Sequence, residues 1–333
     1  MSGEDPEPDG PEPDGPADGQ RASIPGEVIR DLKDMDFTAE ILPVDAKTVV
    51  ELRKDVVFWA VAFLGLAPLL VAALPSPRLQ LAGFGLFFAA VWGAIMKSLI
   101  VGAPDVPMRP LLTSFAFSAT VGVFLLFGLY DTVVPRALIM LPAHPNPLIS
   151  ALGFVLQVGV LEELVKVLPV LWYLRTARRR RVDVLTILLI GVFSGLGFAS
   201  LENLLFSNAA NEHSIRLLLT KGAQGLEEGV YSAMVIVMLR SLSLVFCHGL
   251  WSGIFAYFIA VSRFTQARLG ALFLVGLAVS GTLHGLYDWA STRSMIAATS
   301  MASVSFMLFY AYMSKLDLKF GVDDSGSRRR GPD

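Results

Sequence analysis

The stretch that decides the fold is LISALGFVLQVGVLEELVKVLPVLWYL, residues 148–174, which is followed by RTARRRR at residues 175–181. As a helix rising about 1.5 Å per residue, the apolar part is longer than the roughly 30 Å hydrocarbon core of a bilayer. Arginines directly after such a span are typical of a cytoplasmic loop. We therefore interpret the stretch as a transmembrane helix that ends in the cytoplasm. Binding of anionic lipid is the alternative reading of the arginine run.

Apolar stretches of similar length recur along the chain. In lipid every backbone polar group must be paired internally, so each stretch is expected to be a helix. The fold predicted is an all-α, polytopic membrane helix bundle of about eight transmembrane helices. The expected spans are residues 56–74, 81–101, 111–130, 148–174, 183–206, 241–262, 270–290 and 295–314.

Alternation of the spans about the arginine loop places both termini in the cytoplasm. The longest connection on the opposite side is residues 207–240, where we expect an interfacial or re-entrant helix that leads to Arg240. The first three spans contain no acidic residue or histidine at mid-depth. We expect these three spans to serve as scaffold or lipid shield.

Composition excludes several classes of protein. Of the 333 residues 54% are apolar and 17% are charged, against about 25% charged residues in an average soluble domain. An ordinary cytosolic enzyme is therefore excluded. The only cysteine, Cys247, rules out a disulfide scaffold. No contiguous basic surface points to nucleic acid, so the partners expected are the lipid bilayer and a membrane-anchored protein.

The chain divides by composition into four parts. Residues 1–24 form an acidic Pro/Gly tail, which we expect to be disordered because it has no apolar surface to bury. Residues 25–55 form a cytoplasmic juxtamembrane segment, residues 56–314 the transmembrane domain, and residues 315–333 a cytoplasmic tail. The expected catalytic core is about residues 148–290.

Ionisable residues inside the spans are the main functional signal. A charge at mid-bilayer costs roughly 2.5–3.5 kcal/mol on insertion scales, so such residues usually face a protein interior and mark a site. Glu162 and Lys166 are four residues apart on one helix face, and Glu163 is three residues from Lys166. A carboxylate with limited solvation suits a general base that activates water. A buried ion pair that fixes helix packing is the alternative.

Two further groups lie in the fifth and sixth spans. Glu202 is a candidate metal ligand or acid–base residue, and the neighbouring Asn203 is a donor that can hold a peptide carbonyl. Interhelical hydrogen bonding is the alternative for this pair. His248 lies in the sixth span and is either a site residue or a structural histidine. Cys247 points about 100° away from it on a helix, which excludes a Cys–His nucleophile pair.

The fourth group is His284 with Asp288, at i and i+4 on one face of the seventh span. The carboxylate can orient the imidazole, or both can face one ligand. Counted from the cytoplasmic ends of their spans, Glu163, His248 and His284 lie at about 16–21 Å, and Glu202 lies at about 28 Å. The sequence therefore predicts one buried polar site in the outer half of the membrane.

Four motifs carry a resemblance to a known family. In order along the chain they are EExxK (Glu162–Lys166), FxxxEN (Phe198–Asn203), HGxWSG (His248–Gly253) and HGxxD (His284–Asp288). This series resembles the PrsW family of intramembrane proteases over about residues 148–290. It is distantly similar to the membrane-embedded CAAX prenyl proteases and to bacteriocin-processing membrane proteases.

The resemblance implies hydrolysis of peptide bonds in membrane-anchored substrates near the extracytoplasmic side. It implies an inner (cytoplasmic) membrane of the bacterial type, and a first cut in an anti-sigma factor. By position, Glu162 would activate water, and Glu163 and Lys166 would set its charge state. His284 and Asp288 would orient the reactants or stabilise the oxyanion. Glu202 and Asp288 replace residues of the CAAX-type motifs.

The sequence leaves alternatives open for both the cofactor and the function. A zinc site made of Glu202, His248 and His284 is one interpretation, and zinc would lower the pKa of its water. Water attack driven by glutamate without metal is the other. Acids and histidines in a membrane also serve a proton-coupled transporter or channel, although the halves show no inverted repeat. A prenyl-peptide protease and a catalytically inactive scaffold are the remaining alternatives.

Overall fold

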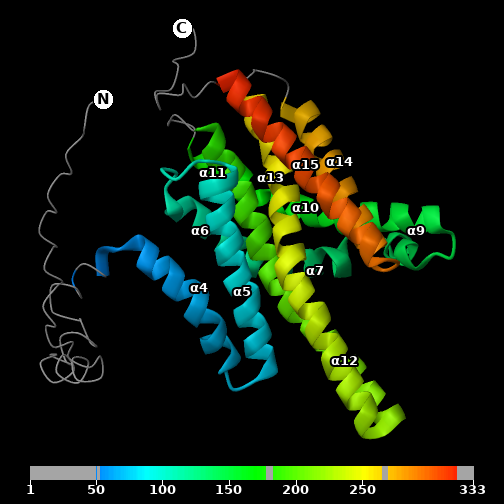
Figure 1. Ribbon diagram of the computed structural model, residues 1–333. Helices are drawn as coiled ribbons and strands as arrows, with labels where there is room; N and C mark the ends of the chain where they lie inside the picture. Colours follow the sequence, from blue (N-terminus) through cyan, green and yellow to red (C-terminus); the bar gives the residue numbers. More distant parts are fainter. Residues whose placement is uncertain (1–49, 51–52, 178–182, 265–268, 321–333) are drawn as a thin grey trace, which may run out of the picture. The chain divides into compact units, whose positions relative to one another are not determined.

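The computed structural model describes residues 50, 53–177, 183–264 and 269–320. Every secondary-structure element in these ranges is a helix, as Figure 1 shows. The all-α prediction is therefore confirmed. The predictions for the acidic tail (1–24), most of the juxtamembrane segment, four arginines of the basic loop and the chain after residue 320 lie outside the described ranges.

The chain forms two compact units, Met1–Leu64 and Gly65–Asp333. The described part of the first unit holds the start of α4 (Val56–Ala72), where the Asp55 carboxylate accepts the backbone N–H of Phe58 at 3.1 Å and caps the helix. All other elements lie in the second unit. They are α5 (Pro77–Ile95), η1 (Met96–Ile100), α6 (Met108–Phe117), η2 (Ser118–Gly122), α7 (Val123–Thr132), α8 (Arg136–Met140), η3 (Leu141–Ala143), α9 (Pro147–Gly153), η4 (Phe154–Val160), α10 (Leu161–Lys166), α11 (Leu168–Thr176), α12 (Val184–Leu239), η5 (Arg240–Leu244), α13 (Val245–Phe264), α14 (Leu269–Ser291) and α15 (Met295–Phe320).

Seven helical stretches in the described residues are long and apolar enough to cross a membrane. They agree with seven of the eight expected spans. The eighth, at the start of the domain, is the 17-residue helix α4, which is one residue short of the 18 residues taken as the minimum for a span. The seven are Ala82–Ile100, Met108–Thr132, Pro147–Thr176, Val184–Leu205, Arg240–Arg263, Gly270–Ser291 and Met295–Leu316.

The centre of the bundle consists of α13 and the first half of α12, which pack against each other (Figure 1). Within an 18-residue apolar segment of each span, 89% of the residues are buried in α12 and 83% in the span formed by η5 and α13, whereas only 17% are buried in α15. The outer helices expose large apolar side chains such as Leu148 (79% exposed) and Ile296 (80% exposed). This pattern is expected for a bundle whose periphery faces lipid, where apolar exposure carries no penalty.

The expected connection at residues 207–240 is helical almost throughout. It continues α12 from the fifth span to a turn at Gly222, whose φ of 68° and ψ of −148° interrupt the helix. A positive φ is readily available only to glycine. Beyond the turn the chain returns toward the bundle, since a Cβ on Gly225 would lie 2.2 Å from the carbonyl oxygen of Leu217. A helical hairpin thus leads to Arg240.

The fourth span is broken where its charged residues lie. It runs as α9, the π-helix η4, the α10 turn and α11. Pro169 stands in the first turn of α11 and has no N–H to donate to Val165, so the helix is interrupted directly after Lys166. π-Helical turns are often found at functional sites. Here η4 positions the two glutamates that follow it.

Candidate active site

Three charged side chains of α10 form a buried cluster. The Lys166 ammonium donates hydrogen bonds of 3.0 Å to Oε2 of Glu162 and of 3.0 Å to Oε1 of Glu163. The side chains of Lys166 and Glu163 are fully buried and that of Glu162 is 9% exposed. The Lys166 ammonium also lies 4.4 Å from the centre of the Phe198 ring, on α12. Such a buried cation offsets the cost of placing carboxylates in a low-dielectric interior.

Glu163 is held from three helices. Its Oε1 accepts the hydrogen bond from Lys166 and lies 3.2 Å from Nδ1 of His284 on α14. Its Oε2 accepts a 3.0 Å hydrogen bond from the hydroxyl of Ser252 on α13. Both carboxylate oxygens are therefore engaged. Glu162 differs, because its Oε1 accepts no hydrogen bond from the residues that the structure describes. Of the two glutamates, Glu162 is the one with an oxygen available to a substrate or water.

His284 lies where the carboxylates meet. Its Nε2 is 3.4 Å from Oδ2 of Asp288 and 3.6 Å from Oε2 of Glu162. The imidazole stacks on the indole of Trp251, with 4.3 Å between ring centres and an angle of 16°. The Trp251 N–H donates a 2.9 Å hydrogen bond to the hydroxyl of Ser305 on α15, and this bond fixes the position of the indole. Stacking and hydrogen bonding together set the orientation of the His284 ring.

His248 completes the group from α13. Its ring centre lies 4.7 Å from that of His284, and Phe198 stacks on it at 6.0 Å. Although His248 is only 1% exposed, neither ring nitrogen makes a hydrogen bond in the described structure. Buried polar atoms without a partner are rare in proteins. Both nitrogens are therefore available to a ligand.

Glu202 lies on the other side of His248. Its Oε1 accepts a 2.7 Å hydrogen bond from the Arg240 guanidinium, and its Oε2 lies 3.3 Å from Nε2 of His248, without hydrogen-bond geometry. The helical hairpin at the end of α12 brings Arg240 back to Glu202. The neighbouring Asn203 is 2% exposed, and its amide oxygen and nitrogen have no partner among the described residues.

Glycines allow the helices to approach closely enough to join these groups. A Cβ on Gly195 of α12 would lie 2.1 Å from the carbonyl oxygen of His248, and one on Gly159 of η4 would lie 2.0 Å from that of Gly281 on α14. Contacts this short exclude any side chain at the two positions. Small residues at helix crossings are the usual means of close packing in membranes.

One group of donor atoms fits a metal ion. A nitrogen of His248, a nitrogen of His284 and a carboxylate oxygen of Glu162 all lie within 4.8 Å of one another, and all three residues are buried. Zinc binds imidazole nitrogen and carboxylate oxygen at about 2.0–2.2 Å, which places ligand atoms about 3.3–3.6 Å apart. The group would have to close by only about 1 Å. The contact of His284 Nδ1 with Glu163 is the kind of carboxylate–histidine pair that supports ligating imidazoles.

The structure joins seven of the eight sequence-predicted site residues, all except Asn203, through side-chain contacts. Glu162, Glu163, Lys166, His284 and Asp288 are linked by direct contacts, and Glu202 joins through His248. Within the predicted metal set of Glu202, His248 and His284, the two imidazoles lie in the converging group, whose third member is Glu162. A ligand role for Glu202 stays a prediction.

Sequence reasoning missed three residues of this neighbourhood. Ser252 and Trp251 lie in the quoted HGxWSG motif, and Ser252 is four residues after His248 on the same helix face, so the spacing contained a signal. Arg240 had none, because it is separated from Glu202 by 38 positions and a helical hairpin.

A helix bundle of membrane-spanning length that encloses carboxylates and imidazoles defines a membrane-embedded protein with a buried polar reaction site. The model of the PrsW family of intramembrane metalloproteases matches residues 106–313, more than half of the chain. The chain belongs to this family and is a membrane-embedded peptidase. The match extends beyond the core that the motifs indicated, and includes α6 and most of α15. No curated protein and no solved structure matched the chain.

Proposed function

We propose that this peptidase cleaves membrane-anchored protein substrates at the cluster formed by Glu162, Glu163, His248 and His284. The observation that carries the proposal is the meeting of carboxyl and imidazole groups from α10, α12, α13 and α14 at one buried place. A buried polar group is costly unless it serves packing or chemistry. Partnerless nitrogens on His248 favour chemistry.

Glu162 is proposed as the general base. Its Oε1 takes a proton from water while the water oxygen attacks the carbonyl carbon of the scissile peptide bond. The same oxygen then returns the proton to the leaving amide nitrogen as the carbon–nitrogen bond breaks. Lys166 holds Oε2 through a hydrogen bond, which leaves Oε1 to face the water. Glu163 acts by position, because its contacts hold Lys166, Ser252 and His284 in place.

His284 and Asp288 are proposed to orient the reactants and to stabilise the oxyanion. A donor placed beforehand in a low-dielectric site stabilises developing negative charge far more than it would in water. Asn203, whose amide is buried without a partner, is proposed to hold a carbonyl of the substrate backbone.

We propose that zinc binds between His248 and His284, and that the Glu162 carboxylate lies beside it as the base rather than as a ligand. When bound, zinc would polarise a carbonyl or lower the pKa of water. The electrostatics support a cation there, because Glu162, Glu163, Glu202 and Asp288 outnumber the fixed cations Lys166 and Arg240.

The expected cut lies near the extracytoplasmic side of an inner membrane. With Arg175 and the basic loop in the cytoplasm, the positive-inside rule orients the bundle with both termini inside. Glu163, His248 and His284 are then about 20 Å from the cytoplasmic ends of their spans, in a hydrocarbon core of roughly 30 Å. The substrate proposed is an anti-sigma factor with one membrane span, which receives its first cut here.

Reconstitution tests the position of the cut. The purified chain and a single-span substrate tagged at both ends are placed in the same liposomes, and fragment masses locate the cleaved bond. We expect a bond in the outer third of the span, and a bond in the cytoplasmic half would contradict the proposal.

Coexpression tests the substrate class. Single-span anti-sigma factors tagged at both ends are produced with the wild-type chain or with Glu162→Gln. A truncated product only beside the wild type is expected. Intact anti-sigma factors, in cells that cut the generic single-span substrate, would overturn the substrate assignment and leave the peptidase standing.

A further inference from the structure

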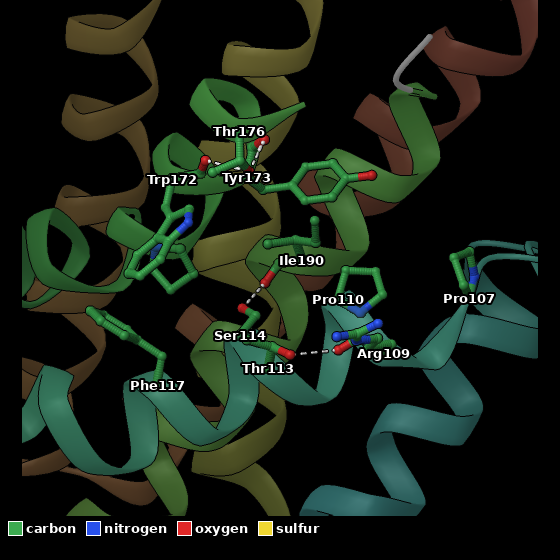
Figure 2. A pocket seen from close by; sticks show the side chains of 11 residues that line it. Pro107, Arg109, Pro110, Thr113, Ser114, Phe117, Trp172, Tyr173, Thr176 and Ile190 are labelled. Atoms are coloured by element: carbon green, nitrogen blue, oxygen red, sulfur yellow. Dashed lines mark hydrogen bonds between the residues drawn. The ribbon is translucent and has the colours of Figure 1, made fainter. Parts of the chain in front are cut away.

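A groove on the outside of the bundle lies apart from the proposed active site. It runs between α6 and α11, has a volume of about 540 Å³, and has Ile190 of α12 at its back, as Figure 2 shows. A second hollow of about 750 Å³ shares Arg109, Thr113 and Phe117 with it and continues along α6 to Thr120 in η2. We call the two together the α6 groove.

The α6 groove has one charged end and an apolar remainder. Arg109 lies in the first turn of α6 and is exposed, and its guanidinium forms no ion pair within the described part of the chain. Deeper along the groove, the Trp172 indole meets the Phe117 ring edge to face at 6.5 Å, and Trp172 is 63% exposed. An unpaired cation at one end and exposed aromatic side chains along the rest of the groove complement a ligand with an anionic head and an apolar tail.

The length of the groove matches one leaflet of a bilayer. From Arg109 to Thr120 the helix rises about 16 Å at about 1.5 Å per residue, and half of a hydrocarbon core of roughly 30 Å is about 15 Å. Arg109 stands where α6 begins and Thr176 where α11 ends, so the charged end lies at the membrane surface. A tail that starts there reaches the middle of the bilayer at the end of the groove.

We propose that the α6 groove binds one anionic phospholipid, with its phosphate at Arg109 and an acyl chain along Thr113, Phe117 and Trp172. Arginine suits phosphate because its planar guanidinium presents several N–H donors to the oxygens. The hydroxyls of Thr113 and Thr176 donate to backbone carbonyls of their own helices, and Arg109 is the one charged residue among those that line the two hollows, so Arg109 is the headgroup contact. The α6 groove would then hold one bound lipid molecule in place of lipids that exchange with the bilayer.

Quenching of tryptophan fluorescence tests this proposal on the full chain in mixed micelles. The probe is phosphatidylglycerol with brominated acyl chains, compared with phosphatidylcholine bearing the same chains. Subtracting the signal of Trp172→Phe isolates Trp172 among the five tryptophans. We expect phosphatidylglycerol to quench Trp172 at a mole fraction about fivefold lower than phosphatidylcholine, the preference that one basic residue gives near an anionic headgroup.

Two arginine variants separate the groove from general surface charge. Arg109→Gln should remove the preference for phosphatidylglycerol. The matched control is Arg136→Gln, since Arg136 is also exposed, also lies in the first turn of a helix and also follows a proline-led turn. It should keep the preference. Equal quenching by both lipids, or equal loss in both variants, would overturn the proposal.

Competition distinguishes the other occupants. Inorganic phosphate at millimolar concentration should leave the quenching unchanged, and its abolition by phosphate alone would indicate a free-anion site. A single-span helical peptide should not displace the brominated lipid. Displacement by the peptide in the wild type, but not in Thr113→Trp, would identify the groove as a docking site for a substrate helix and would refute lipid binding.

Discussion

The Ser252 hydroxyl on α13 donates a 3.0 Å hydrogen bond to Oε2 of Glu163 on α10, in a part of the bundle where both side chains are buried. This bond joins the two helices that carry the proposed base and one of the imidazoles. It also satisfies the carboxylate oxygen that Lys166 and His284 do not reach. Ser252 is therefore a positioning residue for the cluster.

Ser252→Ala should destabilise the folded chain by about 1–3 kcal/mol, because it leaves a buried carboxylate oxygen without a donor. The thermal unfolding midpoint in detergent checks this. Ser262→Ala is the matched control, since Ser262 is equally buried on the same helix but bonds only to the Ile259 carbonyl. If the two substitutions lowered the unfolding midpoint equally, the hydrogen bond from Ser252 would have no special role in stabilising the cluster.

The two adjacent glutamates should respond differently to the same substitution. Glu163→Gln disturbs contacts with three residues, and breaking a buried charge pair costs about 3–5 kcal/mol, so the unfolding midpoint should fall clearly. Glu162→Gln disturbs one lysine hydrogen bond and a looser 3.6 Å contact with His284, so the variant should unfold nearer to the wild type. Midpoints in the reverse order would mean that the structural and reactive roles are exchanged.

Metal analysis of the purified chain should find about one zinc ion per molecule. His248→Ala and His284→Ala should each lose it, because each removes one nitrogen of the converging group. Glu162→Gln should keep the metal, because Glu162 is proposed as the base and not as a ligand. A metal-free chain that cleaves substrate fully in the presence of chelator would refute the zinc proposal.

Substitution at the helix crossing should disrupt the site without touching its chemistry. Gly195→Ala forces a Cβ to within 2.1 Å of the His248 carbonyl oxygen, which requires α12 and α13 to separate. We expect loss of folded, monodisperse protein in size-exclusion chromatography. Gly128→Ala is the control, because a Cβ there meets nothing within 4 Å, and alanine favours helix by up to about 1 kcal/mol. A stable Gly195→Ala protein would contradict the packing described.

The membrane-spanning helices could be predicted from sequence because their signal is local. A run of about 20 apolar residues by itself indicates the length of the helix, and seven such runs agree with the structure. The breaks within the runs carry a weaker signal. Pro169 marks the end of α10, but nothing in the amino-acid sequence of residues 154–160 distinguishes the π-helix η4 from an α-helix.

That these residues would gather in one place was predictable from the sequence, and their pairings were not. Charges at mid-membrane depth identify Glu162, His248 and His284, because lipid excludes such residues unless they face an interior. Which carboxylate meets which imidazole depends on helix rotation and crossing, set by contacts such as Gly195 on the His248 carbonyl. The Arg240–Glu202 pair depends further on the turn at Gly222, which composition does not predict.

The most direct test of the central claim is the cleavage rate of a reconstituted single-span substrate by Glu162→Gln. Removal of a general base costs about 10²–10⁴-fold in rate. We predict a loss of at least this size in liposomes where the variant shows the unfolding midpoint of the wild type. Cleavage at the wild-type rate would contradict the account, because the catalytic carboxylate would then lie elsewhere.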